Sequence, residues 1–186
     1  AMCHTYDDLR SDKHHMMVIS PDEGALNRNI YYSSAMGVDM GMFYKRRDYT
    51  RVVNGRNPIV AHEYLGDSVE GKDVFVADDI IASGDSILDL AYNLKKRKAK
   101  RVFAGATFAF FTSGLEAFDK AYADGVIDHV FATNLTYTPQ AVLDRPWFSQ
   151  ADMSKYMAFV IATLNHDQSL SYLLNPWNRI EKLLTK

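Results

Sequence analysis

The chain has 186 residues, of which 47% are hydrophobic, enough for one full-sized core and too few to promise two independent cores. Its 21 basic and 23 acidic side chains give a formal net charge of -2, which provides no global positive excess for binding a nucleic acid or an anionic membrane. The single cysteine excludes an internal disulfide framework and favours a reducing, cytoplasmic location.

The first residues contain no hydrophobic signal core. We predict that residues 1–15 are an expression-tag remnant followed by a lead-in, and that residues 16–186 form a single α/β domain. The most apolar stretches, residues 102–111 and 156–164, have about half of the roughly 20 residues that a membrane-spanning helix needs. Both stretches are therefore predicted to be core.

The first part of the domain predicts a strand, a helix and two more strands. Residues 16–20 are a buried strand, and residues 25–37 carry apolar side chains at helical intervals before a glycine stop. A second strand over residues 38–47 ends on three cations. Asn-Gly and Asn-Pro within residues 48–58 predict an exposed loop or hairpin tip, and residues 59–66 predict a third strand.

The middle of the chain alternates strand and helix. The run VFVADD, residues 74–79, is typical of a strand that is covered on both faces. Ser86 and Asp89 form a Ser-x-x-Asp start signal for the next helix. The buried stripe of that helix is predicted to be Ile87, Leu88, Ala91 and Leu94. The elements that follow are a strand (101–108), a helix (113–125) and a strand (129–133).

This alternation predicts an α/β fold with a mostly parallel twisted sheet and helices on both faces. Residues 151–186 are expected to add two or three helices, with breaks at PWFSQAD (146–152) and NPWN (175–178). The cationic run 95–101 complements the end of a helix dipole and is interpreted as solvated rather than as a nucleic-acid site.

Small and polar residues follow the strand of residues 74–79. In an open α/β sheet, ligands bind at the carboxyl ends of the strands. Residues 82–86, Ala-Ser-Gly-Asp-Ser, predict a turn into a helix, which offers backbone N–H groups and the positive end of the helix dipole to a phosphate. Ser83 and Ser86 add hydroxyl donors, and Gly84 permits close approach of the backbone. The loop therefore suits a phosphate group.

Asp78 and Asp79 require a different partner, because carboxylates repel a phosphate. Acceptor-only groups beside an anion site suit the hydroxyls of a sugar or a bridging Mg²⁺. A phosphate next to two hydroxyls describes a ribose phosphate. The loop lacks a Walker A lysine and G-x-G-x-x-G spacing, which argues against triphosphate and dinucleotide sites. The alternative is an ordinary buried strand followed by a capped helix.

The segment VFVADDIIASGDS, residues 74–86, resembles the phosphoribosyl-diphosphate binding motif of type I phosphoribosyltransferase folds. VISPDEGALNRN, FYKRRDYT and VIDHVFATN resemble, in order and spacing, the C-terminal half of ribose-phosphate diphosphokinases. The likeness covers residues 16 to about 175. It implies an enzyme that converts ribose 5-phosphate and ATP to phosphoribosyl diphosphate and AMP with Mg²⁺, and it implies a homo-oligomer.

The resemblance also implies roles for particular residues. Lys45 and Arg47 match the lysine and second arginine of the family's Lys-Arg-Arg and are the implied catalytic residues. Asp22 matches the aspartate of Ser-Pro-Asp that helps to hold Mg²⁺. The implied ribose 5-phosphate site consists of Asp78, Asp79, Ala82, Ser83, Gly84, Asp85 and Ser86.

The sequence departs from the family at two points. The loop begins with Ala82 where the family usually has aspartate, and Asp85 occupies its fourth position, so we expect the Asp85 carboxylate to point away from a phosphate, towards the helix N-terminus. The family's N-terminal half, which supplies most of the ATP-binding surface, has no counterpart in these residues. The chain alone is therefore expected to be a poor diphosphokinase.

Other interpretations remain open. A phosphoribosyltransferase that consumes the diphosphate with a base would need a hood over the base, and no clear hood is evident. A regulatory partner of the synthase would bind ribose phosphate without catalysis. At single positions, Asp22 could equally be a helix N-cap, and Lys45, Arg46 and Arg47 could be a solvated strand end.

Overall fold

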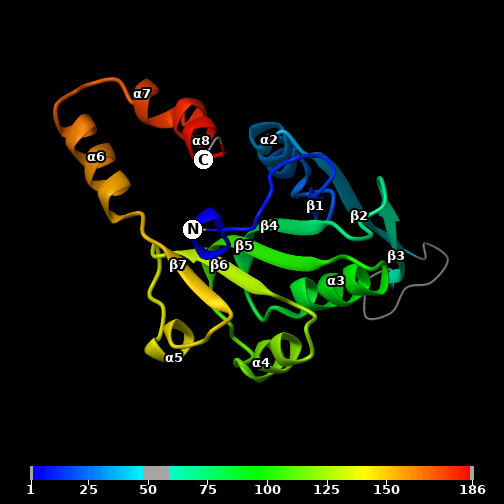
Figure 1. The fold of residues 1–186 in the computed structure, drawn as a ribbon. Coiled ribbons are helices and arrows are strands. Elements are labelled where there is room, and N and C mark those ends of the chain that lie inside the picture. Colours follow the sequence, from blue (N-terminus) through cyan, green and yellow to red (C-terminus); the bar gives the residue numbers. More distant parts are fainter. Residues whose placement is uncertain (1, 48–58, 185–186) are drawn as a thin grey trace.

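The computed structural model describes residues 2–47 and 59–184, which fold around a seven-stranded sheet with helices on both faces (Figure 1). The strands are β1 (Met16–Ser20), β2 (Asp39–Arg47), β3 (Ile59–Leu65), β4 (Asp73–Ile81), β5 (Arg101–Ala109), β6 (His129–Thr133) and β7 (Phe148–Ala151). The helices are α1 (Met2–Thr5), α2 (Leu26–Met36), α3 (Asp85–Lys96), α4 (Glu116–Ala123), α5 (Gln140–Leu143), α6 (Ser154–Asn165), α7 (Ser171–Leu174) and α8 (Trp177–Leu184).

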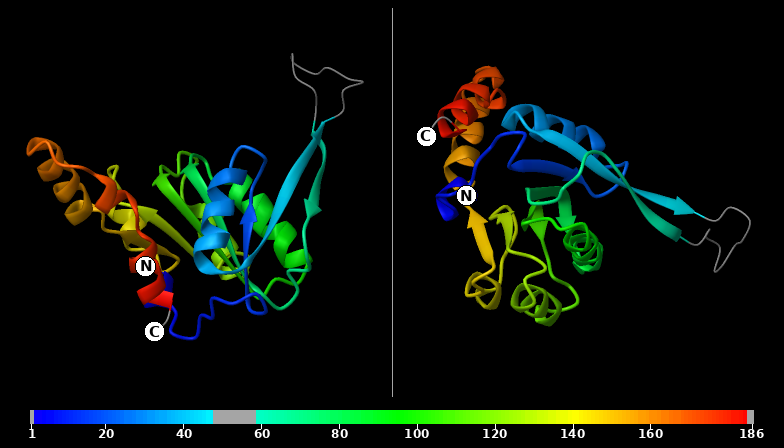
Figure 2. Two further views of the ribbon diagram at one scale, coloured as in Figure 1. Left: turned by 90° about the horizontal axis from the view of Figure 1, so that it is seen from above. Right: turned by 45° about the vertical axis from the view of Figure 1, so that its right-hand side comes forward.

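The strand order is β3-β2-β1-β4-β5-β6-β7. Every neighbouring pair is parallel except β2 and β3, which form an antiparallel hairpin at one edge. The predicted α/β class with a mostly parallel sheet and helices on both faces is confirmed. Figure 2 shows the β2–β3 hairpin extending from one side of the molecule and helices α6 to α8 lying on the opposite side.

The central strands are apolar along their length because helices cover both faces of the sheet. All five residues of β1 are buried. β4 extends to Ile81, beyond the predicted span of 74–79, and its exposed residues, Asp79 and Ile80, lie near its carboxyl end. The sheet thus has a buried middle and a polar carboxyl edge.

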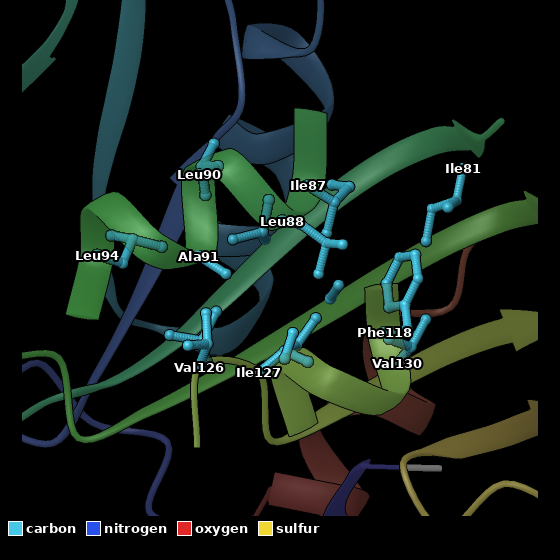
Figure 3. Close-up of a cluster of buried hydrophobic side chains, with 14 of the residues drawn as sticks. Ile81, Ile87, Leu88, Leu90, Ala91, Leu94, Phe118, Val126, Ile127 and Val130 are labelled. Atoms are coloured by element: carbon cyan, nitrogen blue, oxygen red, sulfur yellow. The ribbon is translucent and has the colours of Figure 1, made fainter. Parts of the chain in front are cut away.

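The larger core lies between the sheet and helices α3 and α4 (Figure 3). Residues Ile87, Leu88, Ala91 and Leu94 of α3 are all buried, as predicted. They meet Phe118 of α4, whose side chain has no exposed surface. Complete burial of a leucine or phenylalanine side chain contributes about 1.5–3 kcal/mol, so this layer fixes the position where α3 begins.

The other face of the sheet carries α2 and the N-terminal segment. Met16 and Val18 pack there with Tyr32, Met36 and Phe75. The ring centroid of Tyr6 lies 4.9 Å from that of Phe103, and Arg101 Nη1 contacts Asp8 Oδ1 at 2.8 Å. The described residues of the predicted lead-in therefore pack against the sheet.

The C-terminal part contains the helices α6, α7 and α8, in agreement with the predicted two or three. No helix covers the predicted break at 146–152, but residues 148–151 form β7, a strand that was not predicted and that pairs in parallel with β6. α8 contacts α2, and the ring of Trp177 lies 5.6 Å from that of Tyr31. None of the helices in the described ranges combines the length and apolar character that crossing a membrane requires.

Candidate functional site

The candidate site lies where the connectivity of the sheet changes direction. From β1 the chain passes through α2 to β2 on one side, whereas β4 leads through α3 to β5 on the other side. The carboxyl ends of β1 and β4 therefore flank a topological switch point, where open α/β sheets bind ligands. The loops that begin with Pro21 and Ala82 leave these two neighbouring strand ends.

Asp78 and Asp79 lie near the carboxyl end of β4 and share one cation. Arg28 of α2 contacts Asp78 Oδ1 through Nη1 at 3.3 Å and Asp79 Oδ2 through Nη2 at 3.4 Å. Backbone N–H groups also orient both carboxylates, since Asp79 N–H donates to Asp78 Oδ1 at 2.8 Å and Ile80 N–H donates to Asp79 Oδ1 at 3.0 Å. The pair is thus held at the polar edge of the sheet.

The pKa values of the two carboxyl groups are shifted in opposite directions. Burial raises the pKa of Asp78, whose side chain is 24% exposed. The hydrogen bond with Asp78 lowers the pKa of Asp79, whose side chain is 63% exposed. Where two carboxyl groups interact, the one in the less solvated position holds a proton more strongly. Asp78 is therefore the member of the pair that gains a proton first as the pH falls.

The loop from Ala82 to Ser86 joins β4 to the start of α3. Gly84 has φ +94°, a conformation that favours glycine. A Cβ atom at Gly84 would also lie 2.1 Å from a ring carbon of Phe118. The Thr112 N–H donates to Ala82 O at 2.9 Å, which ties the loop to the segment after β5. The core and this hydrogen bond together fix a turn that directs the N-terminus of α3 to the sheet edge, as the sequence predicts.

The predicted Ser-x-x-Asp start signal was wrong in its position. α3 begins at Asp85 with Gly84 as its N-cap, so Ser86 already lies inside the first turn. Ser83 lies one residue before that N-cap, and its Oγ accepts the Asp85 N–H at 3.3 Å and donates to Asp85 Oδ2 at 2.9 Å. The Asp85 carboxylate is thus turned onto the Ser83 hydroxyl at the start of the helix.

Asp22 lies in the loop between β1 and α2 and orients the start of that helix. Its Oδ1 accepts the Ala25 N–H at 3.1 Å, while its backbone oxygen accepts the Ser20 hydroxyl at 2.8 Å. No group of three or more His, Cys, Asp or Glu side chains suited to a metal occurs among the described residues. One carboxylate together with substrate phosphates is a usual arrangement for Mg²⁺, so Asp22 fits that ion only as a single protein ligand.

Lys45 and Arg47 lie in the last part of β2, beyond Met42, the last residue of β2 that pairs with β1. Their backbones pair with His62 and Ile59 of β3, and the register shifts between Arg46 and Arg47. Because β2 is parallel to β1, its carboxyl end lies at the same edge of the sheet as Asp22. The predicted loop 48–58 lies outside the described residues.

Sequence reasoning missed Arg28 and Asn29 of α2. Asn29 is completely buried, and its Nδ2 donates to Ala77 O at 3.0 Å and to Ala25 O at 2.9 Å. The available signal was electrostatic. Arg28 stands in the first turn of α2, a turn without acidic residues, where the helix dipole disfavours a cation unless carboxylates face it.

A cavity of about 160 Å³ lies beside Asp78, on the face of the sheet that α2 covers. Its lining is mostly apolar, and Thr133 Oγ1 donates to Thr107 O at 2.6 Å at its polar end. A side chain on Gly105 would meet the ring of Phe75, so glycine leaves this space open. The lining residues are Tyr32, Phe75, Ala77, Asp78, Gly105, Ala106, Thr107, Phe131, Ala132, Thr133 and Ala151.

The chain is similar to known proteins over most of its length. It is 34% identical to the ribose-phosphate pyrophosphokinase of Vibrio cholerae over 160 aligned residues. The alignment covers 86% of this chain and 48% of that protein. It is 30% identical over 169 residues to the ribose-phosphate pyrophosphokinase of Chromobacterium violaceum, which covers 90% of this chain and 49% of that protein. The chain therefore spans about half the length of the curated relatives it matches.

Structural comparison gives the same fold. The crystal structure of phosphoribosylpyrophosphate synthetase from Mycobacterium smegmatis matches with a TM-score of 0.67 and 22% identity, over 82% of this chain and 45% of that one. These matches confirm the resemblance to the C-terminal half of that class of enzyme. The sequence profile described as phosphoribosyl transferase domain matches residues 4–135, which include every predicted site residue. The chain belongs to the phosphoribosyl transferase domain family.

Proposed function

We propose that this chain binds ribose 5-phosphate at the carboxyl edge of its sheet. One observation carries the proposal: β4 places Asp78 and Asp79 directly before a loop that presents the N-terminus of α3. The loop would hold the 5-phosphate through backbone N–H groups, the helix dipole and hydroxyls. The carboxylates would accept hydrogen bonds from the hydroxyls of the ribose.

The reaction that we propose is diphosphoryl transfer. The anomeric hydroxyl of ribose 5-phosphate attacks the β-phosphorus of ATP, a new O–P bond forms, the bond to the α-phosphate oxygen breaks, and AMP leaves. The hydroxyl loses its proton in this step. Such transfers depend on positioning and on cations that stabilise charge on phosphate oxygens.

Lys45 and Arg47 are the cations that we propose for this role. Their backbones lie at the carboxyl end of β2, at the same edge as the loops after β1 and β4. Mg²⁺ would neutralise charge on the phosphates when it is bound, and Asp22 is its proposed protein ligand. Asp22 is held in place for this by its hydrogen bond from the Ala25 N–H.

The similarity to ribose-phosphate pyrophosphokinases supports this choice of substrates, although the chain spans about half of their length. We propose that a segment equivalent to the other half supplies most of the ATP-binding surface, so that the isolated chain has little or no activity. A homo-oligomer and a cytoplasmic location, with no nucleic-acid or membrane partner, belong to the same proposal.

A second candidate is a phosphoribosyltransferase that consumes phosphoribosyl diphosphate with a base. The cavity beside Asp78 favours it, because the rings of Phe75 and Phe131 and the side chain of Tyr32 line a space of about 160 Å³ that a planar ring could enter. In that reaction the base would replace diphosphate on the sugar.

An activity assay separates the candidates. The protein at its natural length is incubated with Mg²⁺ and either ribose 5-phosphate and ATP, or phosphoribosyl diphosphate and a series of bases. Release of AMP that depends on ribose 5-phosphate supports the synthase, whereas release of diphosphate that depends on a base supports the transferase. Binding of ribose 5-phosphate without either reaction would identify a regulatory ribose-phosphate-binding partner and would contradict both enzymes.

A further inference from the structure

Arg28 occupies an unusual place for a cation. It is the third residue of α2, so the positive end of the helix dipole opposes its charge. Two carboxylates face it, because its Nη1 lies 3.3 Å from Asp78 Oδ1 and its Nη2 lies 3.4 Å from Asp79 Oδ2. The guanidinium fork presents two donors in a fixed geometry, which a lysine ammonium cannot reproduce.

Asn29 fixes the backbone of Arg28 relative to the carboxylates. Its Nδ2 donates to Ala77 O, one residue before Asp78, and to Ala25 O just before α2. These two carbonyl acceptors determine the orientation of the amide. Its Oδ1 is buried without a hydrogen-bond partner among the described residues. A buried oxygen without a hydrogen-bond partner lowers the free energy of unfolding. The Asn29 amide therefore joins α2 to the end of β4 at some expense of folding stability.

Adjacent residues in a strand direct their side chains to opposite faces of a sheet. Asp78 and Asp79 nevertheless meet, through the hydrogen bond between their side chains and through Arg28. Arg28 engages one oxygen of each, although 50 residues separate it from Asp78 in the sequence. The one guanidinium thus contacts both carboxylates, which a hydrogen bond also links to each other.

We propose that Arg28 is a positioning residue that aligns Asp78 and Asp79 to accept two neighbouring hydroxyls of the ribose. The inference rests on the proposed function and extends it to a residue outside the phosphate loop. The Arg28 side chain is 30% exposed and that of Asp79 is 63% exposed, so the ion pair itself contributes little to folding stability. Its effect is on the alignment of the acceptors.

Among the side chains that the structure describes, the cation paired with Asp78 and Asp79 is Arg28. The cavity beside Asp78 is lined by Tyr32 from α2, and by Gly105, Thr107 and Thr133 from β5 and β6. In the part of the chain that the structure describes, Asp78 forms an ion pair with Arg28, and its neighbouring carboxylate is Asp79. Loss of Arg28 therefore removes the common partner of both acceptors.

The test compares three ligands on four proteins by calorimetric titration in the presence of Mg²⁺. The ligands are ribose 5-phosphate, 2-deoxyribose 5-phosphate and inorganic phosphate. The proteins are the wild-type chain, Arg28→Met, Arg28→Lys and, as the matched control, Arg10→Met, which removes an exposed arginine near Asp73, at the opposite end of β4 from Asp78 and Asp79. Thermal unfolding of each variant verifies that it is folded.

We expect Arg28→Met to weaken binding of ribose 5-phosphate by roughly ten-fold or more, as for the loss of charge-assisted hydrogen bonds. Binding of inorganic phosphate should weaken much less, because the loop of residues 82–86 is intact and only the long-range attraction of one cation is lost. The preference for ribose 5-phosphate over its 2-deoxy analogue should shrink, and Arg28→Lys should restore it only in part.

The inference would be overturned if a folded Arg28→Met protein kept its affinity for ribose 5-phosphate and its preference over the 2-deoxy analogue. An equal loss of affinity for all three ligands would also overturn it. Failure of the folded wild-type chain to bind ribose 5-phosphate would instead contradict the proposed function, and the inference would fall with it. The wild-type titration therefore separates the two failures.

Discussion

Asp78 and Asp79 are neighbours in the sequence, yet their surroundings shift their pKa values in opposite directions. Burial raises the pKa of Asp78, and the hydrogen bond with Asp78 lowers that of Asp79. Arg28 faces both groups and favours their ionised forms. At neutral pH the site therefore presents acceptors, and Asp78 is the group whose protonation would first remove one.

Replacement of Asp78 tests its role as an acceptor. We predict that Asp78→Asn weakens binding of ribose 5-phosphate by roughly ten-fold or more, because a charged acceptor becomes a neutral amide. Asp89→Asn is the matched control, since Asp89 is exposed on α3. Calorimetry measures both variants, and equal affinities of wild type and Asp78→Asn would contradict the assignment.

The raised pKa of Asp78 predicts a pH dependence of binding. As the pH falls through that pKa, Asp78 becomes protonated and ceases to be a charged acceptor, so affinity for ribose 5-phosphate decreases at a higher pH than for an ordinary aspartate. The sign for stability is opposite. The folded state binds the proton more tightly than the unfolded chain, so protonation of Asp78 increases the free energy of unfolding as the pH falls.

Titrations of wild type and Asp78→Asn over a pH series separate Asp78 from the ligand, whose phosphate also titrates near pH 6. The phosphate of the ligand titrates in the same way with both proteins. A difference between their profiles of affinity against pH is therefore due to Asp78. Parallel profiles would show that Asp78 does not govern binding.

Residue types alone predicted the site only within one contiguous stretch, whereas Asp22, Lys45 and Arg47 were assigned through the resemblance to a family. Residues 74–86 carry carboxylates, loop and helix start in one stretch, and the structure places them together at the sheet edge. Arg28 could not be placed in this way. Its contact with Asp78 depends on the pairing of β1 with β4, which brings α2 beside a strand 50 residues later.

At the scale of elements, the loop between β4 and α3 depends on Gly84. We predict that Gly84→Ala destabilises the fold by about 2–4 kcal/mol, because the positive φ and the contact with Phe118 both oppose a Cβ. Gly125→Ala is the control, with φ +66° and nothing within 4 Å of its Cβ, and should cost only about 1 kcal/mol. Urea unfolding measures both, and equal losses would show that the Phe118 contact has no effect.

The Ser83–Asp85 contact gives a second prediction at this scale. Asp85 holds the Ser83 hydroxyl at 2.9 Å and brings negative charge to the predicted phosphate loop. Asp85→Asn should therefore strengthen binding of inorganic phosphate and of ribose 5-phosphate, by about three-fold to ten-fold for one removed like charge near the surface. Isothermal titration at low and high salt measures it. Weaker binding by Asp85→Asn would show that Asp85 instead supports the ligand.

Buried strands and amphipathic helices could be read from the sequence, whereas short edge elements could not. The continuous apolar runs of β1, β4 and β5 indicate buried strands. The buried residues of α3 recur at helical spacing and indicate an amphipathic helix. β7 has only four residues, Phe-Ser-Gln-Ala, and becomes a strand by pairing with β6. The start of α3 was misplaced because Ser86 matches a capping residue, whereas the N-cap in the structure is Gly84, which packs against Phe118.

At the scale of the whole molecule, the sheet brings the ends of β1, β2 and β4 to one edge. This order unites Asp22, the backbones of Lys45 and Arg47, and the loop after β4, although they are distant in the sequence. The predicted parallel sheet implied a common edge but not the order of strands along it. The order comes from the packing of α2 and α3 on opposite faces.

Other properties of the whole molecule stay predictions. The resemblance implies a homo-oligomer, and α6 has no buried residue while Phe159, Ile161 and Leu164 are 49%, 64% and 57% exposed. The chain spans about half of its curated relatives, so their full reaction is proposed only for a protein that also provides the remaining surface. The proposed binding of ribose 5-phosphate, in contrast, is argued only from the elements described above.

The most direct measurement is calorimetric titration of this chain with ribose 5-phosphate and Mg²⁺, beside the same chain with Ser83→Ala and Ser86→Ala. The account predicts saturable binding by the wild-type chain and weaker binding by the folded double variant, because both hydroxyls lie at the start of α3. Absence of binding by the folded wild-type chain, or equal binding by both proteins, would contradict the assignment of the loop after β4 as a sugar-phosphate site.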